Sequence, residues 1–212
     1  MSSAPAPSSI RQAQDGSGQA PLHRPEAVAI ARAFVSAIED ATDQLVVGGS
    51  LRRRLAWVSD IEVVAVPKMF EATDGLFGDV PVRVNHLEDR LQAMLDHGEV
   101  DKRRDRHGVT RWGPTLKYLS FQGAKVDLFS PGPQRFGWIL LLRTGPAAFS
   151  RQLVVPRGKR TKDDRPGLLP PTVLPRDGWL TDKTSGQRIE TPTERDAFRV
   201  LGLDWIEPWE RT

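Results

Sequence analysis

Hydrophobic and polar positions repeat with helical spacing in one segment and form short unbroken runs in others. The helical pattern covers residues 25–43, where a proline stands at the start. Its apolar positions are Val28, Ala31, Phe34, Val35 and Ile38. Apolar runs at residues 45–47 and 61–66 end at Gly48 and Pro67 and predict buried strands. The pattern therefore predicts a helix that packs its apolar stripe on a sheet.

The rest of the chain predicts short elements separated by glycine and proline. Leucines spaced four apart indicate a helix over residues 87–97. A short edge strand is expected at residues 80–84, and strands typical of an antiparallel meander are predicted at residues 109–112, 115–122 and 125–129. Helices are predicted at residues 147–154 and 193–200, and Thr191-Pro192-Thr193-Glu194 has the hydroxyl-then-acid pattern of a helix cap. A loop over residues 156–175 and a small hairpin around Ser185-Gly186 are expected between these helices.

Composition narrows the class of protein. The 212 residues are enough for one ordinary domain, and the hydrophobic share of 39% can build a core. Cysteine is absent, which excludes disulfides and cysteine-ligated zinc, and no charge-free apolar run approaches the length of a bilayer span. Residues 1–24 are rich in small and polar residues and predict a disordered tail without a secretory signal. We therefore expect a soluble protein with no membrane partner, in the cytoplasm of a bacterial or phage-infected cell.

Two of the predicted strands, at residues 61–66 and 125–129, carry or adjoin carboxylates that could bind a metal ion. Residues two apart on a strand project to the same face, so Asp60 and Glu62 present both carboxylates at one end of the sheet. Paired oxygens of this kind suit Mg²⁺, although two solvated acids at the mouth of a strand would give the same pattern. Asp127 interrupts an apolar strand and lies either at an exposed sheet edge or beside another metal ligand. Three carboxylates from two adjacent strands would complete a two-metal site.

A glycine-serine turn precedes the first acids, in the segment Gly48-Gly49-Ser50-Leu51-Arg52-Arg53. Glycines let the backbone approach a phosphate, and the free N–H groups at a helix start attract its charge. Ser50 adds a hydroxyl donor, and one of the two arginines can face the carboxylates and orient phosphate oxygens. The alternative is an ordinary strand-to-helix turn with surface arginines. Together with the acids, the turn favours nucleotidyl transfer as the leading hypothesis.

The ordered set of motifs resembles the palm and thumb of family X DNA polymerases, the polymerase beta-like nucleotidyltransferases. The first part of the resemblance is carried by Gly49-Ser50-Leu51-Arg52-Arg53, Asp60, Glu62, Asp127, Arg143-Thr144-Gly145 and Phe149. Residues 193–203, followed by Trp205-Ile206-Glu207-Pro208 and Arg211, resemble the C-terminal motif of the same polymerases. The resemblance covers about residues 25–211 and is greatest to stand-alone palm-and-thumb members.

This resemblance implies an α+β (α/β) fold. It consists of a nucleotidyltransferase palm over residues 25–134, with a mixed or antiparallel sheet flanked by helices, and a small thumb over residues 135–212. The implied reaction is Mg²⁺-dependent transfer of a nucleoside monophosphate from a (d)NTP to a 3′-hydroxyl, with release of pyrophosphate. Two Mg²⁺ ions, or Mn²⁺ in their place, are the implied cofactors. A nucleoside triphosphate and a nucleic-acid primer or template-primer, expected to be DNA, are the implied partners of a monomer.

The resemblance also implies residue roles. Asp60, Glu62 and Asp127 would bind the metals, with Asp127 nearest the primer hydroxyl and acting as its base. Contacts to the nucleotide fall on Gly49, Ser50, Arg53, Ser59, Thr144, Gly145, Phe149 and Ser150. Candidate contacts to nucleic acid are Arg151, Arg157, Lys159 and Arg160, whose segment reads equally well as a plain loop, and the net charge of +3 does not decide between the two. The charged run at residues 101–107 is expected to be a solvated hairpin tip.

Two departures from the family pattern leave alternatives open. Glu62 stands where the family's second metal ligand is usually Asp, and Leu142-Arg143 stands where an aromatic pair often precedes Thr-Gly. The choice between ribose and deoxyribose is therefore open. An RNA end or a protein hydroxyl could be the acceptor instead, or the chain could be a catalytically idle nucleic-acid-binding accessory protein.

Overall fold

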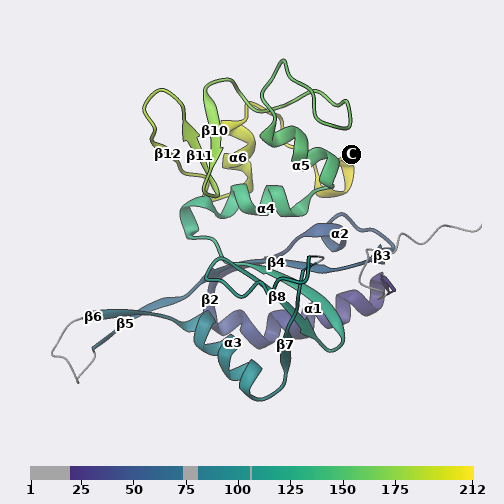
Figure 1. Cartoon of the computed structure of the whole chain (residues 1–212), viewed down its shortest axis with the longest axis vertical. Helices are drawn as coiled ribbons and strands as arrows, with labels where there is room; N and C mark the ends of the chain where they lie inside the picture. Colours follow the sequence, from purple (N-terminus) through teal and green to yellow (C-terminus); the bar gives the residue numbers. More distant parts are fainter. Residues whose placement is uncertain (1–19, 74–80, 106) are drawn as a thin grey trace, which may run out of the picture.

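A five-stranded mixed sheet forms the centre of the N-terminal half (Figure 1). The computed structural model describes residues 20–73, 81–105 and 107–212. The strand order is β2-β4-β9-β8-β7, with β2 at Thr42–Val47, β4 at Ile61–Pro67, β7 at Val100–Lys102, β8 at Leu116–Phe121 and β9 at Ala124–Phe129. Strands β4 and β9 run parallel, and the other neighbouring pairs run antiparallel. The predicted α+β fold with a mixed sheet is confirmed.

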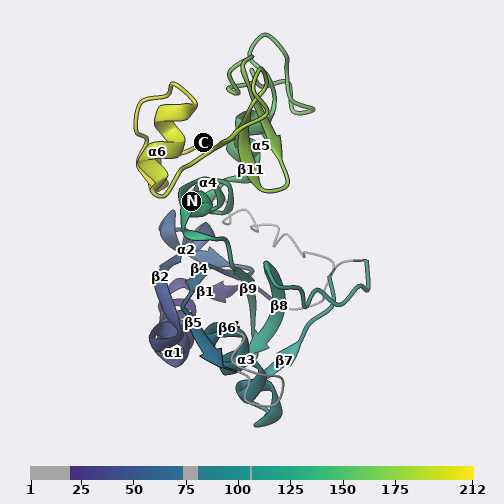
Figure 2. The same cartoon turned by 90° about the vertical axis from the view of Figure 1, so that its left-hand side faces the viewer.

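Helices cover both faces of this sheet, as Figures 1 and 2 show. On one face, α1 (Arg24–Ile38) and α3 (His86–Asp96) form the main core with alternate residues of β4 and β9. On the other face, Val64 and Phe129 pack against Phe136 of α4 (Phe136–Thr144). Strand β4 is therefore apolar on both sides, which explains its nearly continuous hydrophobic run. Glu62 is the acidic interruption of this run.

The C-terminal half has its own core above the sheet. Its elements are η2 (Pro133–Arg135), α4, α5 (Ala147–Val154), β10 (Val173–Arg176), β11 (Trp179–Asp182), β12 (Arg188–Ile189), α6 (Glu194–Val200) and η3 (Pro208–Glu210). The three strands form an antiparallel sheet, with the predicted turn at Ser185-Gly186 between β11 and β12. Helix α4 contributes Trp138 to this core and Phe136 to the sheet. Because α4 belongs to both cores, the boundary between residues 134 and 135 stays a prediction.

Several predicted boundaries at the start of the chain were wrong. Leu22–His23 forms strand β1, which pairs with β3 (Trp57–Val58), so these residues do not belong to the predicted tail. The remainder of that tail, at residues 1–19, lies outside the described residues. Helix α1 is followed by the 3₁₀ turn η1 (Glu39–Ala41), and β2 starts three residues earlier than its apolar run. Backbone pairing, which leaves no apolar pattern, extends β2 along β4.

Two further differences concern the middle of the chain. A hairpin of β5 (Met69–Thr73) and β6 (Pro81–Asn85) projects from the sheet (Figure 1), although only its second strand was expected. Residues 109–112 make only the isolated bridges Arg104↔Thr110 and Trp112↔Lys117 instead of a strand. Within residues 20–73, 81–105 and 107–212, no helix is both long and apolar enough to cross a membrane.

Candidate active site

Glu62 and Asp127 lie directly opposite each other on the parallel strands β4 and β9. Asp127 is paired on its other side with Tyr118 of β8, whose carbonyl accepts a hydrogen bond of 2.9 Å from the N–H of Arg103 just after β7. Because residues paired across strands share a face, these four side chains form one row across the sheet. This cross-sheet row lies on the side of α4, since Val64, two residues beyond Glu62, packs there.

Burial and mutual repulsion couple the three predicted metal ligands. Burial raises the pKa of Glu62 to about 8, and the charges of Asp60 and Asp127 add to the rise. Burial also raises the pKa of Asp127 to about 6; the adjacent Arg103 opposes this rise and Asp60 adds to it. Asp60 therefore acts on both paired acids, and the three form one electrostatic unit. Oxygen donors that repel one another in this way fit a divalent cation such as Mg²⁺.

The three carboxylates are not converged on a single point. Among the described residues, no group of three His, Cys, Asp or Glu side chains is arranged to hold a metal ion. Two contacts accompany this arrangement: Asp127 accepts a hydrogen bond from Arg103, and the Glu62 carboxylate rests against Gly49. The residue types and the strand register therefore fit divalent metals, whereas the side chains must rearrange to ligate them.

The glycine turn between β2 and the short helix α2 (Gly49–Arg52) is built against Glu62. The N–H of Gly48 donates to the Glu62 carbonyl at 2.7 Å, and Gly49 has a φ of 59°. A Cβ atom at position 49 would overlap Oε2 of Glu62, so both the conformation and the space require glycine. Within the described chain, the buried Oγ of Ser50 has no hydrogen-bond partner, which makes it available to a bound anion.

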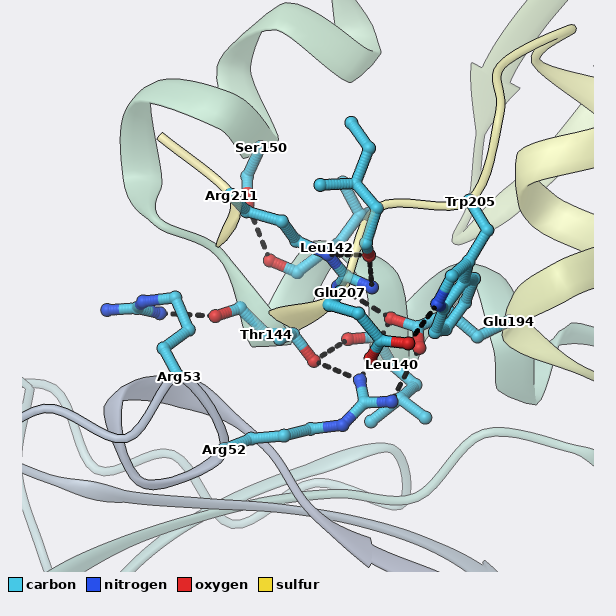
Figure 3. A network of polar contacts seen from close by, with 11 residues as sticks. Arg52, Arg53, Leu140, Leu142, Thr144, Ser150, Glu194, Trp205, Glu207 and Arg211 are labelled. Atoms are coloured by element: carbon cyan, nitrogen blue, oxygen red, sulfur yellow. Dashed lines mark hydrogen bonds and ion pairs between the residues drawn. The ribbon is translucent and has the colours of Figure 1, made fainter. Parts of the chain in front are cut away.

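Three successive arginines at the end of this turn all contact the C-terminal half, and Figure 3 shows the first two, Arg52 and Arg53. Arg52 donates to both carboxylate oxygens of Glu194, at 2.9 and 2.6 Å, and to Oγ1 of Thr144 at 2.8 Å. Arg53 donates to the carbonyl oxygen of Thr144. The guanidinium carbon of Arg54 lies 3.5 Å from the ring centre of Trp209. The turn predicted to bind phosphate is thus also the main polar link between the two halves.

Glu194 is the centre of this link and is missing from the predicted site. Its side chain is 5% exposed, and it also accepts a 2.8 Å hydrogen bond from Arg211, whose side chain is fully buried. The predicted cap at Thr191–Glu194 was wrong by two residues. The capping box joins Thr193 and Asp196, which leaves Glu194 free to turn inward. Arg211 continues the network to the Ile206 carbonyl at 3.1 and 3.0 Å (Figure 3).

Comparisons with known proteins find related polymerases. A family model described as the DNA polymerase beta thumb matches residues 139–212. DNA polymerase lambda of Rattus norvegicus is 27% identical over 166 residues, which are 77% of this chain and 28% of that protein. This chain is similar to family X DNA polymerases. We therefore call its N-terminal half, up to Gly132, the palm and its C-terminal half, from Pro133, the thumb.

Two further relatives carry the name DNA nucleotidylexotransferase. The DNA nucleotidylexotransferase of Xenopus laevis is 31% identical over 94 residues, which are 43% of this chain and 16% of that protein. The enzyme of the same name from Oncorhynchus mykiss is 32% identical over 124 residues, which are 58% of this chain and 20% of that protein. The chain thus matches less than a third of the length of each of these three relatives.

The predicted Thr-Gly motif lies where α4 ends. Thr144 is fully buried and its Oγ1 donates to the Leu140 carbonyl at 2.7 Å. Gly145 follows with a φ of 67°, beside the guanidinium of Arg53. The motif is therefore adjacent to the glycine turn through Arg53, and its predicted contact with the nucleotide stays a prediction.

The remaining predicted nucleotide contacts are placed differently. Phe149 is 4% exposed and lies in the thumb core, and its predicted contact with the nucleotide stays a prediction. Its apolar character serves packing. Ser150 Oγ donates to the Leu142 carbonyl at 2.8 Å and joins α5 to α4. Ser59 is exposed in the turn before Asp60, where it can still meet a ligand.

Most of the predicted nucleic-acid contacts of the thumb are engaged within the fold. Arg157 donates to the carbonyls of Leu201 and Gly202, at 2.6 and 3.2 Å, and so holds the end of α6. Arg151 donates to Asp163 at 2.6 Å, and Arg160 pairs with Asp164. Lys159 is exposed in the same loop. The contacts with nucleic acid predicted for these four residues stay predictions.

Two arginines near the acids were not among the predicted site residues. Arg103 belongs to the charged run that was expected to be a solvated hairpin tip, yet it contacts Asp127. The guanidinium carbon of Arg143 lies 4.1 Å from the ring centre of Phe129. The positive charge of Arg143 partly opposes the rise in the pKa of Glu62 and of Asp127. The departure at Leu142-Arg143 from the family's aromatic pair was a signal for Arg143. No periodicity signals Arg103.

Proposed function

We propose that this chain is a Mg²⁺-dependent nucleotidyltransferase that transfers a nucleoside monophosphate from a (d)NTP to a 3′-hydroxyl and releases pyrophosphate. The observation that carries the proposal is the direct pairing of Glu62 with Asp127, with Asp60 beside them and the Gly49 turn packed on Glu62. This combination supports both a cation site and an adjoining phosphate site. The names of the relatives support a DNA acceptor.

Asp60, Glu62 and Asp127 would hold two divalent ions, Mg²⁺ or Mn²⁺. Such ions lower the pKa of an attacking hydroxyl and stabilise the charge of the leaving pyrophosphate when bound. Within the chain, Asp127 accepts the proton of the 3′-hydroxyl. Ser50 Oγ and the Arg53 guanidinium orient phosphate oxygens, and Arg53 leaves the Thr144 carbonyl to do so.

The direct test is extension of labelled acceptors by the wild-type chain and by Asp127→Asn. The acceptors are a template-primer, a gapped duplex, single-stranded DNA and single-stranded RNA, each with dNTPs or rNTPs and Mg²⁺ or Mn²⁺. We expect extension of DNA by the wild type and a loss of about 10²- to 10⁴-fold in Asp127→Asn, because a positioned acid-base group contributes that much. Sedimentation of the same preparations tests the expected monomer.

Asp89→Asn is the matched control, because Asp89 is an exposed acid on α3, the helix that covers the opposite face of the sheet. It should extend DNA at the wild-type rate. Wild-type extension by a folded Asp127→Asn variant would refute the assignment. If only RNA is extended, the proposed acceptor is RNA instead of DNA. If no acceptor is extended, the results favour a catalytically idle accessory protein.

A further inference from the structure

Arg103 ends the cross-sheet row in direct contact with Asp127. Its Nη2 donates to Oδ1 of Asp127, and the two side chains are 23% and 13% exposed. The guanidinium passes over Tyr118, with 4.9 Å between its carbon and the ring centre. A charge-assisted hydrogen bond in such a half-buried place is stronger than a surface ion pair. The strand register therefore places the positive charge of Arg103 beside Asp127, a predicted metal ligand.

The contact is incomplete on the arginine side. The Nε of Arg103 is buried and lacks a hydrogen-bond partner in the part of the chain that the structure describes. A buried donor without a partner costs free energy. The neighbouring Arg111 differs, because its Nε donates to Oδ2 of Asp105 at 2.9 Å. Arg103 is thus held at Asp127 by charge and by the Tyr118 ring, rather than by a full set of hydrogen bonds.

Arg103 has room to move away from Asp127. The two residues line a cavity of about 500 Å³ together with Tyr118, Arg111 and Asp105. A divalent cation at Asp127 would repel the guanidinium at contact distance, and the repulsion is strong where water is partly excluded. Rotation of the arginine side chain into the cavity relieves this repulsion without a change in the strands.

We propose that Arg103 is a positioning residue that competes with divalent metal for the carboxylate of Asp127. It occupies Asp127 before the metal binds and turns into the cavity when the metal binds. The inference rests on the proposed function, because it takes Asp127 as a metal ligand. It follows that the protein binds metal more weakly than its three acids alone would, and that metal loading moves a residue of the β7–β8 hairpin.

The test is the affinity of the nucleic-acid-free protein for Mn²⁺, measured from the electron paramagnetic resonance signal of the free ion. Arg103→Gln removes the charge and keeps a polar stem beside Tyr118. We expect this variant to bind Mn²⁺ about tenfold more tightly, the size of one lost charge-assisted hydrogen bond. Arg103→Lys keeps the charge but loses the planar group over Tyr118, so its Mn²⁺ affinity should lie between those of the wild type and Arg103→Gln. A merely structural role predicts the opposite sign, with weaker binding in the variant.

Arg111→Ala is the matched control, because Arg111 lines the same cavity and pairs with Asp105. It should change the Mn²⁺ affinity by less than about twofold, since an exposed pair contributes little. A second measurement uses the wild type alone and therefore does not depend on the folding of a variant. The Nε–H resonance of Arg103 should shift on addition of Mg²⁺, while that of Arg111 stays in place. An unchanged Arg103 resonance at saturating Mg²⁺ would overturn the proposal.

Asp127→Asn separates failure of this inference from failure of the proposed function. If the wild type has no Mn²⁺ site that Asp127→Asn weakens, then Asp127 is not a ligand and the proposed function itself is wrong. If Asp127→Asn weakens the site but Arg103→Gln binds Mn²⁺ no more tightly than the wild type, only the competition is wrong.

Discussion

Arg52 and Glu194, 142 residues apart, form a two-point ion pair between palm and thumb, with distances of 2.9 and 2.6 Å. The same carboxylate holds the fully buried guanidinium of Arg211 at 2.8 Å. Arg52 immediately precedes Arg53, the predicted triphosphate ligand. The position of the thumb and the shape of the phosphate turn are therefore coupled through one buried acid.

Glu194→Gln should destabilise the protein strongly. The substitution keeps the volume of the side chain but leaves Arg52 and the buried Arg211 without their anion. Removing one partner of a buried ion pair costs about 3–5 kcal/mol, and we expect a loss of this size in urea unfolding. The comparison variant is Arg199→Ala, which breaks an ion pair with Asp196 in which the arginine is 76% exposed. Arg199→Ala should lower the free energy of unfolding by less than about 1 kcal/mol. Equal losses in the two variants would contradict the role of Glu194 in coupling palm and thumb.

Glu194 and Arg103 show why part of this structure could not be predicted from sequence. Strands β4, β8 and β9 were predictable because apolar runs bounded by Gly and Pro report burial directly. Glu194 follows a hydroxyl residue at a helix start, which favours a cap, and only the folded chain shows which acid closes the box. Long-range partners of a charged side chain leave no periodic trace.

In the candidate site, too, the local features could be predicted from sequence and the long-range contacts could not. The same-face placement of Asp60 and Glu62 follows from strand periodicity alone, and the adjoining glycine turn is equally local. The pairing of Glu62 with Asp127 depends on β9 inserting beside β4 in parallel, which is a choice of topology. Arg103 reaches Asp127 only because β8 lies between their strands at the right register. A charged run gives no indication of such a contact.

Gly49→Ala should impair both folding and catalysis. Residue 49 has a φ of 59°, and a Cβ atom there would overlap the Glu62 carboxylate. Gly98→Ala is the matched control, because Gly98 has a φ of 70° and open space around its Cβ position. The left-handed conformation alone costs about 1–2 kcal/mol, so urea unfolding should show that loss for Gly98→Ala and a larger one for Gly49→Ala. Only Gly49→Ala should lose primer extension, and normal extension by that variant would show that Glu62 need not stay at the turn.

Arg157→Ala and Lys159→Ala should separate thumb stability from nucleic-acid binding. Arg157 binds two carbonyls at the end of α6, so its removal should lower the free energy of unfolding by about 1–3 kcal/mol. Lys159 is exposed, and its removal should leave stability within about 0.5 kcal/mol of the wild type. If Lys159 contacts a phosphate, its alanine variant should reduce the slope of log K against log salt by about one. An unchanged slope in DNA-binding titrations would remove Lys159 from the interface.

Glu62→Gln should make the metal-free protein more stable at alkaline pH. Burial and the neighbouring acids raise the pKa of Glu62 from 4.5 to about 8 in the folded state. A raised carboxyl pKa contributes stability that is fully present below pH 4.5 and is lost as the pH rises through 8. In EDTA, the stability advantage of Glu62→Gln over the wild type should therefore grow between these values, by at most about 1.4 kcal/mol per pH unit, and level off above them. Urea unfolding across this range measures the difference, and a constant difference would mean that Glu62 does not titrate as a buried acid. Mg²⁺ should reduce the pH dependence of the wild type, because a bound cation favours the charged carboxylate.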